Sequence, residues 1–363
     1  MNDFLTSGTV IRGKQHEYCV LQLIGRSGTS ATYQVQCLTD RSIWVLKELR
    51  PLSELSDVEF MEIYQLFLYE ANLLGTLSHP NIVKLGEFLV FESRPLFIME
   101  FVAGKTLEIF LQVTKTHFLE QEAINYGIQL ARVLHYLHTH QPPIIYRDLK
   151  PNNIILTPEG VIKLIDFSIA RIYKPGLQKD EIALGTAGYA PPEQYGHAQT
   201  DARSDVYALG ATLLHLLTGT QPVPLKIPSS GDIRKINTTV NAQVEDVIIK
   251  AMQLDRSFRY QSAADIAQAL IKCLCIDERY EIIFQKNSKM AEDFKDQFKH
   301  NHELIKEYNK RLRVLELQAA KFGLYVPPHI PIEIDEITEK VRICEQVIEK
   351  IERVFVTKIP KES

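Results

Sequence analysis

The chain lacks any hydrophobic run long enough to cross a membrane. Its longest apolar stretch, YALGATLLHLLTG at residues 207–219, contains His215 and is shorter than the about 18 residues that a spanning helix needs. The stretch is therefore interpreted as a buried helix. The first ten residues, MNDFLTSGTV, lack the basic and apolar regions of a secretory signal. These absences predict a cytoplasmic protein with no membrane span.

An excess of basic charge and paired cysteines are also missing. The 363 residues include 41 Lys and Arg against 45 Asp and Glu, which gives a net charge of −4. Such a balance predicts no nucleic-acid-binding surface. Five cysteines are scattered along the chain, and Cys273 with Cys275 forms only a CxC inside a helical run. We interpret them as small buried side chains rather than metal ligands. The cysteines are Cys19, Cys37, Cys273, Cys275 and Cys344.

The pattern of apolar residues divides the chain into a strand-rich part and a helical part. The first part alternates as strands do, apart from one helical stretch, and the second shows helical spacing from about residue 106. This order is typical of an α+β protein. Predicted strands are 18–25, 31–38, 42–49, 82–90 and 95–102. Predicted helices are 57–77, 107–114, 120–140, 204–219, 241–253 and 262–274.

The composition changes near residue 279, where Lys, Glu, Asn and Gln become frequent. Apolar residues there recur at alternating spacings of three and four, which predicts two helices with heptad seams separated by a break at Gly323 and VPPHIP. The tail is interpreted as an intramolecular hairpin, a dimerising arm or a docking module for a partner protein. The first seam is Ala291, Phe294, Phe298, Ile305, Tyr308, Leu312, Leu315, Ala319 and Phe322. The second is Ile334, Ile337, Val341, Cys344, Ile348, Ile351 and Phe355.

Two short segments place polar residues between apolar runs. The segment PPIIYRDLKPNNIIL, residues 142–156, carries Asp148, Lys150 and Asn153, and VIKLIDFSIA carries Asp166. A carboxylate can accept a hydroxyl proton, while an amide oxygen with a second carboxylate suits Mg²⁺. A lysine can neutralise a phosphoryl group in transfer, since such transfer depends on positioning and charge stabilisation.

A turn of small residues near the N-terminus complements this set. The segment IGRSGTSATYQV, residues 24–35, lies between two predicted strands and can direct backbone N–H groups at phosphates. Lys47 lies on the third strand, and Glu70 on the next helix is its natural ion-pair partner. Together these features predict a site for a nucleotide.

The ordered motifs resemble those of Hanks-type, eukaryotic-like protein kinases, and the style is closest to bacterial Ser/Thr kinases. The resemblance covers residues 18–278 through the turn at 25–35, VLKEL, YEANLL, YRDLKPNN, DFS, GTAGYAPPE, SDVYALG and RSFRYQSA. It implies a bilobal kinase fold with an N-lobe at about 18–103 and a C-lobe at about 104–278. Residues 1–17 are then an N-terminal lead-in, and 279–363 a helical or coiled-coil extension.

The resemblance also implies roles for individual residues. Asp148 would be the base, Lys150 would steady the phosphoryl group, and Lys47 with Glu70 would hold ATP phosphates. Asn153 and Asp166 would bind Mg²⁺, with Mn²⁺ as an alternative ion. Asp205 would brace the catalytic loop, Glu193 would pair with Arg259, and Met99 would be the gatekeeper. The implied nucleotide contacts are Ile24, Gly25, Arg26, Ser27, Gly28, Lys47, Glu100, Val102, Asn153 and Asp166.

Several positions depart from the family pattern. Ser27 and Ser30 stand where the second and third loop glycines are expected, Tyr146 replaces a histidine, and Ser168 replaces the glycine of the metal-binding triplet. The residues assigned to chemistry are intact. We therefore predict an active enzyme that phosphorylates Ser or Thr on proteins. The alternative is a nucleotide-binding pseudokinase scaffold that signals through its tail.

The activation segment lacks the usual phosphate acceptors. Between Ser168 and Thr186 there is no Ser or Thr. Arg147, which precedes the catalytic aspartate, is the residue that such a phosphate would pair with. We predict that Asp180 or Glu181 takes the place of the phosphate, so that the enzyme needs no phosphorylation there. The alternative is that both acids are solvated loop charges.

Overall fold

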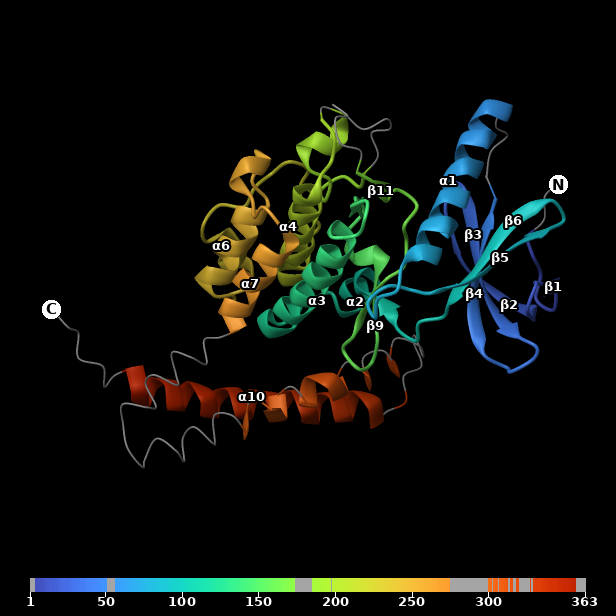
Figure 1. The fold of residues 1–363 in the computed structure, drawn as a ribbon. Coiled ribbons are helices and arrows are strands. Elements are labelled where there is room, and N and C mark those ends of the chain that lie inside the picture. The colour runs from blue at the N-terminus through green and yellow to red at the C-terminus, as the bar shows by residue number, and fades with distance from the viewer. Residues whose placement is uncertain are drawn as a thin grey trace.

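The computed structural model describes residues 4–50, 56–173, 185–196, 198–274 and, with gaps, 300–356. A strand-rich lobe and a helical lobe follow one another along the chain, and a helical tail comes after them (Figure 1). The predicted α+β bilobal architecture is therefore confirmed.

The small lobe is built on a six-stranded antiparallel sheet with the order β1-β2-β3-β4-β6-β5. All five predicted strands are present. The sixth strand, β1, was not predicted, because residues 1–17 were interpreted only as a lead-in. It pairs with β2, with Val10 opposite Cys19, so this segment is part of the small lobe. The strands are β1 (Val10–Arg12), β2 (Glu17–Arg26), β3 (Ser30–Cys37), β4 (Ile43–Leu49), β5 (Leu85–Phe91) and β6 (Arg94–Glu100).

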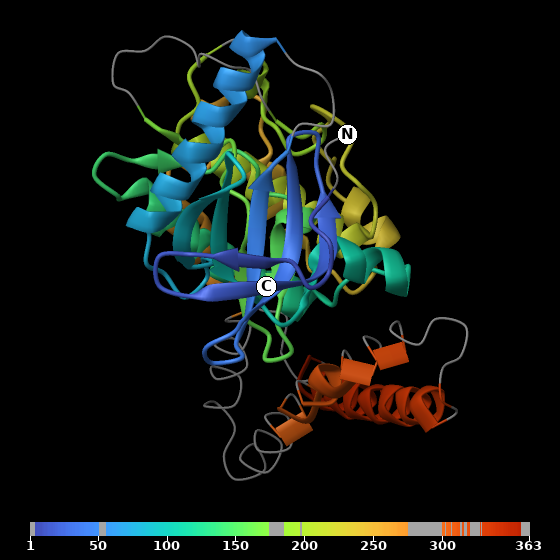
Figure 2. The same ribbon diagram turned by 90° about the vertical axis from the view of Figure 1, so that its right-hand side faces the viewer.

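Helix α1 (Asp57–Thr76) covers one face of this sheet. It begins at a capping box, in which Ser56 and Glu59 satisfy each other's backbone N–H groups. Phe67 packs on Phe97 of β6 with ring centroids 5.0 Å apart, and Glu70 is buried on the same side of the helix. The opposite face of the sheet carries a second apolar cluster that includes Tyr33, Val35 and Leu96. Figure 2 looks onto this lobe with the N-terminal strands nearest the viewer.

The large lobe packs around two long helices, α3 (Glu120–His138) and α4 (Ala202–Thr218). They approach closely at Gly127, where an added Cβ would lie 3.0 Å from Leu213. The predicted helices are present, and α5 (Asp232–Ile236) was not predicted because it is only five residues long. The others are α2 (Leu107–Thr114), α6 (Ala242–Ala251) and α7 (Ala263–Leu274). Among the described helices, none is both long and apolar enough to cross a membrane.

Short strands of the large lobe hold the loops that matter for function. Strands β9 (Ile154–Leu156) and β10 (Ile162–Leu164) pair as a hairpin, and β9 also pairs with β7 (Lys105–Thr106). Strand β8 (Ile144–Ile145) pairs with β11 (Arg171–Ile172). The segment with Asp148 lies between β8 and β9, and Asp166 follows β10. Two strand ends therefore deliver the two polar segments singled out in the sequence.

In the tail, the described parts of residues 300–319 lie against helix α10 (His329–Val356) (Figures 1 and 2). Leu315, Ile330 and Ile337 are buried together, and Arg311 forms an ion pair with Glu333 at 2.6 Å. Helix α10 begins inside the predicted break, since a proline such as Pro331 is tolerated in a first turn where its missing N–H has no helical partner. Seam residues 291, 294, 298 and 322 lie outside the described residues.

Candidate active site

A cavity of about 720 Å³ lies beneath the turn between β2 and β3. One part of its lining is apolar and includes Ile24, Met99 and Ile165, while Lys47 and Asp166 are charged. An apolar region next to a charged one that contains a lysine suits a flat base joined to phosphates. Eight of the predicted nucleotide contacts line it: Ile24, Gly25, Arg26, Ser27, Gly28, Lys47, Asn153 and Asp166.

Lys47, Glu70 and Asp166 form a buried charged group at the inner end of the cavity. The Lys47 Nζ lies 2.7 Å from Glu70 Oε1, 2.8 Å from Oε2, and 3.5 Å from Asp166 Oδ1. Burial disfavours the ammonium, but the charges of Asp166 and Glu70 outweigh it and raise the pKa of Lys47 above its ordinary value. The ion pair predicted from sequence is therefore formed, and it holds a permanent positive charge in the cavity.

Asp166 is kept ionised by its neighbours. Burial alone would raise its pKa, but the Lys47 ammonium and hydrogen bonds from Ser168 hold the pKa below its usual value. The backbone N–H of Ser168 donates to Asp166 Oδ1 at 3.1 Å. Ser168 therefore supports the carboxylate in its charged form, which is the form that binds a metal ion.

Asp148 lies at the centre of a second polar group. Its Oδ1 accepts hydrogen bonds from Thr186 Oγ1 at 2.8 Å and from Lys150 Nζ at 3.1 Å. The other oxygen, Oδ2, accepts from Asn153 Nδ2 at 2.7 Å. Lys150 also donates to Thr186 Oγ1 at 2.6 Å. A hydroxyl already occupies one oxygen of Asp148, which is the contact that an acceptor hydroxyl needs with a general base.

Asn153 and Asp166 fit the hard cation that the fold implies. The Asn153 amide nitrogen is turned to Asp148, where it donates to the carboxylate oxygen Oδ2 at 2.7 Å and to the backbone carbonyl at 3.0 Å. That orientation leaves the carbonyl oxygen Oδ1 as the donor atom for a metal. Both residues line the same cavity, and amide and carboxylate oxygens are preferred Mg²⁺ ligands.

The loop that carries Asp148 is braced from α4. Asp205, which is fully buried, accepts hydrogen bonds from the backbone N–H groups of Tyr146 at 2.8 Å and Arg147 at 2.7 Å. His138 Nε2 lies 2.8 Å from the same carboxylate. Arg147 adopts a φ of 69°, a strained conformation for a side chain of this size, and these bonds hold it there. Tyr146 packs edge-on against Phe167 at 5.0 Å, as expected of a core aromatic.

Two serines close the turn above the cavity. Ser27 Oγ accepts a hydrogen bond from the Ser30 N–H at 3.0 Å, and the two hydroxyls lie 2.8 Å apart. Backbone N–H of Ser27 donates to Ser30 carbonyl oxygen at 2.8 Å. A side chain at Gly28 would meet nothing within 4 Å, so this glycine is not required by crowding. The serines that depart from the family pattern thus stabilise the turn.

The remaining implied nucleotide contacts, Glu100 and Val102, belong to the segment that the family resemblance implies to be the hinge facing the adenine, and they are arranged differently from the rest of the site. Glu100 and Val102 do not line the cavity. The Glu100 side chain is bound by Lys163 Nζ of β10 at 2.7 and 2.8 Å, and its backbone N–H donates to the Lys84 carbonyl at 2.9 Å. Val102 is buried in the apolar core. Any contact of Glu100 with a base is therefore limited to its carbonyl group.

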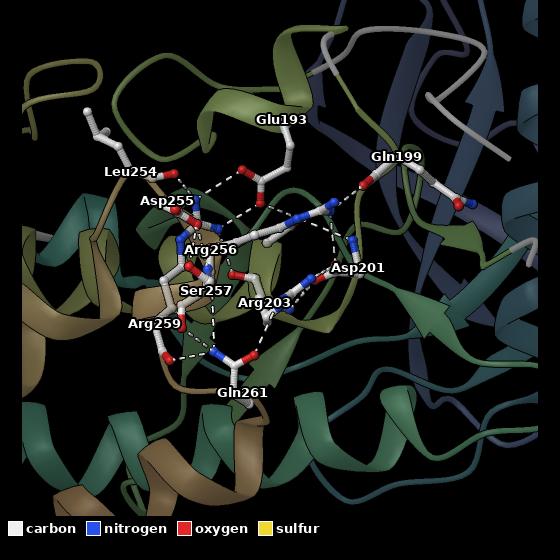
Figure 3. Close-up of polar contacts among 11 residues, drawn as sticks. Glu193, Gln199, Asp201, Arg203, Leu254, Asp255, Arg256, Ser257, Arg259 and Gln261 are labelled. Carbon is white, nitrogen blue, oxygen red and sulfur yellow. Dashed lines mark hydrogen bonds and ion pairs between the residues drawn. The ribbon is translucent and has the colours of Figure 1, made fainter. Parts of the chain in front are cut away.

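A polar network fixes the segment that follows Thr186. Glu193 is buried and binds Arg259 through two contacts, at 2.7 and 3.0 Å, as the motif predicted (Figure 3). Ser204 of α4 donates to Glu193 at 2.8 Å. Around this pair, Arg203 and Arg256 both bind Asp201, with contacts of 2.7 and 3.0 Å (Figure 3). Gln194 in turn donates to the Arg147 carbonyl at 2.7 Å, which ties the segment to the catalytic loop.

Some parts of the site were missed or cannot be compared. Ile155 and Ile165 line the cavity, and their signal in the sequence was their place in the short apolar runs next to Asn153 and Asp166. Thr106 and Ile109 also line it, but they come from a strand and a helix whose approach only the tertiary fold determines. Asp180 and Glu181, predicted to pair with Arg147, lie outside the described residues.

In a comparison with protein families, residues 18–288 match the model described as the protein kinase domain. The chain is 32% identical over 264 residues to the serine/threonine-protein kinase PrkC of Bacillus subtilis, which covers 69% of this chain and 39% of PrkC. It is 32% identical over 288 residues to the probable serine/threonine-protein kinase PknB of Lactococcus lactis, covering 74% and 44%. The chain thus spans less than half the length of these relatives.

Solved structures of similar fold cover the same part of the chain. The kinase domain of PknI from Mycobacterium tuberculosis superposes with a TM-score of 0.58 at 25% identity, covering 75% of this chain and all of that one. The apo form of PpkA-294 has a TM-score of 0.61 at 21% identity and covers 74% of this chain.

Proposed function

The chain belongs to the protein kinase domain family, and on this premise we propose that it is a protein-serine/threonine kinase that transfers the γ-phosphate of ATP to Ser or Thr hydroxyls on proteins. The bacterial relatives carry serine/threonine kinase names, and the match to them covers both lobes. The proposed role is in signalling, with the tail after residue 279 as the segment that contacts a partner protein or a second copy.

The observation that carries this proposal is the arrangement around Asp148. Its carboxylate contacts a hydroxyl, an ammonium and an amide at 2.7 to 3.1 Å, while the Lys47–Glu70 ion pair is closed. A pseudokinase scaffold would have no need of this arrangement. We therefore place that alternative second.

In the proposed reaction, Asp148 accepts the proton of the substrate hydroxyl as the new O–P bond forms. The bond between the γ-phosphorus and the ADP oxygen breaks in the same process. Lys150 lies beside Asp148 and stabilises the charge on the moving phosphoryl group, and Lys47 holds the nucleotide phosphates. Asn153 and Asp166 would hold Mg²⁺, which supplies charge neutralisation at the phosphates when bound. Thr186 keeps Asp148 and Lys150 aligned until a substrate hydroxyl arrives.

The test measures γ-phosphate transfer from Mg²⁺-ATP to the protein itself and to a generic basic protein. Asp148→Asn preserves the size of the side chain and removes its capacity as a base. We expect transfer by the wild type and loss of transfer by the variant, with nucleotide binding retained in both. Binding of nucleotide without transfer in the wild type would contradict the proposal and favour the pseudokinase scaffold.

Regulation by the activation segment is part of the proposal. Arg147 is buried within the loop that carries Asp148, and we propose that Asp180 or Glu181 supplies the negative charge that pairs with it. Because a carboxylate carries about one charge against nearly two for a phosphate, the substitution is partial. Phosphatase-treated wild type is expected to transfer phosphate, and the double variant Asp180→Ala with Glu181→Ala to lose most of that activity. Full activity of the double variant would contradict this pairing.

A further inference from the structure

The segment before β1 folds back over the small lobe instead of leaving it. Gly8 has a φ of 88°, a left-handed conformation that lets the chain turn, and its N–H donates to the Val20 carbonyl at 2.9 Å. Thr9 accepts from the Val20 N–H at 2.9 Å. Residues 4–9, which precede the edge strand β1, therefore lie on the sheet and contact the small lobe.

Leu5 anchors this segment to the face of the sheet opposite α1. It is 9% exposed and belongs to the apolar cluster with Tyr33 and Leu46. The Leu5 N–H donates to Tyr33 Oη at 3.3 Å, and Tyr33 donates to Glu48 Oε2 at 2.8 Å. Burial and the bond to Glu48 raise the pKa of Tyr33 to about 12, so the hydroxyl keeps its proton. The anchor is therefore both apolar and hydrogen-bonded.

Phe4 then lies between two arginines. The guanidinium carbon of Arg26 is 4.5 Å from the ring centroid of Phe4, and that of Arg50 is 4.7 Å away. Arg26 ends β2 and begins the turn over the cavity, whereas Arg50 directly follows β4. Both distances are within the range of cation–π attraction. The ring therefore connects the start of the turn to the end of β4, two strands away in the sheet.

The same strand end also holds the other side of the turn. The Arg50 N–H donates to the Thr29 carbonyl at 2.7 Å, and Arg50 Nη1 binds the buried Glu48 at 2.9 Å. Arg94 binds the same oxygen of Glu48 at 2.7 Å. Arg50 is therefore fixed, and through it Phe4 and Thr29 connect both flanks of the turn to a rigid part of the lobe.

We propose that residues 4–9 form a strap that holds the phosphate-binding turn in place, and that Phe4 is a positioning residue for ATP. The proposal rests on the proposed kinase function. A turn that must be ordered when the nucleotide binds lowers the affinity by the free energy of ordering, and a turn ordered beforehand avoids that loss. Phe4 touches no reacting atom, so its effect is on nucleotide affinity and not on the chemical step.

The experiment compares Phe4 variants in the full chain. Phe4→Ala and Phe4→Leu remove the aromatic face and are expected to raise the KM for ATP about fivefold, which corresponds to about 1 kcal/mol of cation–π attraction, with kcat changed less than about twofold. Phe4→Tyr keeps the ring and should behave as wild type. Phe91→Ala is the matched control, because Phe91 also packs partly buried against the same cluster but at the turn between β5 and β6.

Amide hydrogen exchange without nucleotide provides a second readout that does not depend on catalysis. Phe4→Ala should speed exchange at residues 27–30, and Phe91→Ala should not. Unchanged exchange and an unchanged KM in Phe4→Ala would overturn the strap, as would equal effects of both alanine variants. Faster exchange in a protein that transfers no phosphate would support the strap and reject the kinase function, so the two failures are distinguishable.

Discussion

Glu70 is the residue whose carboxylate fixes the orientation of Lys47. We predict that Glu70→Gln lowers the rate of phosphate transfer roughly 10- to 100-fold, the effect of losing about 1.5–3 kcal/mol from a charged hydrogen bond. Glu87→Gln is the matched control, since Glu87 is a buried carboxylate of the same lobe that accepts from Tyr18 Oη at 2.9 Å. Transfer rates and thermal midpoints of both variants check this. An equal loss of rate in both would mean that lobe stability, not lysine orientation, controls the rate.

The buried His215 makes the free energy of unfolding depend on pH. Its Nδ1 lies 2.7 Å from Tyr189 Oη, and burial lowers its pKa below 6.5 although the Glu108 carboxylate opposes this. Because the pKa is depressed in the folded state, the neutral ring contributes stability that is full above pH 6.5 and lost as the pH falls through the folded value. The free energy of unfolding should fall less between pH 7.5 and 5.5 in His215→Asn than in wild type. His135→Asn, at an exposed position of α3, should behave as wild type.

The sequence indicated the residues assigned to catalysis and the Lys47–Glu70 pair, but not the contacts around Asp148. Asp148, Lys150, Asn153 and Asp166 could be found because each lies in a short polar segment between apolar runs. The bond between Thr186 and Asp148 joins residues 38 positions apart, and no local pattern indicates such a pairing. The stacking of Phe4 between Arg26 and Arg50 was missed for the same reason. Residues 4–9 show no periodicity, and only the folded sheet brings the three side chains together.

Lys163 connects the hairpin of β9 and β10 to Glu100, at the end of β6. This side chain binds Glu100 at 2.7 and 2.8 Å and joins the large lobe to the last residue of β6. We predict that Lys163→Met raises the KM for ATP about three- to tenfold, as expected for the loss of a partly exposed ion pair worth about 1 kcal/mol, and changes kcat less. Lys84→Met is the control, since Lys84 is exposed and its hydrogen bonds with Glu100 are made by its backbone, which the substitution keeps. Steady-state kinetics with varied ATP check the prediction. Equal KM values for Lys163→Met and wild type would contradict a role of this link in nucleotide binding.

Element boundaries followed the sequence where elements were long and failed where they were short. Helix α1 was predicted within one residue from its helical spacing and the proline that follows it, and the structure adds a cap at its start, formed by Ser56 and Glu59. Strands β1, β8 and β11 have two or three residues and cannot show an alternating pattern. These strands form because the backbone N–H and C=O groups of a neighbouring strand pair with theirs. That pairing depends on the tertiary fold and not on the local sequence. Pro331 misled the prediction because a proline in a first turn does not stop a helix.

The whole chain combines a kinase unit with a tail that packs on itself. Residues of the two predicted seams meet in one cluster, in which Leu315 of the first and Ile337 of the second are buried together. Ile330 is an additional member that was not predicted. This packing supports the intramolecular hairpin among the three alternatives. A dimerising arm would instead need a second apolar surface on the outside of the hairpin. In the part of α10 whose side chains are described, the exposed Ile332 and Ile343 lie on such a surface.

Two isoleucines of α10 distinguish these possibilities. Ile337 is 6% exposed and Ile343 is 49% exposed on the same helix. We predict that Ile337→Glu opens the hairpin and lowers the helical circular dichroism signal, because it buries a charge in the apolar cluster without a partner. Ile343→Glu should leave both the signal and the sizing-column mass of the full chain unchanged. If Ile343→Glu halves the mass, the exposed face is a dimer contact, and the tail then serves as a dimerising arm. Phosphate transfer to a generic protein should persist in both variants, because the residues assigned to catalysis all precede the tail.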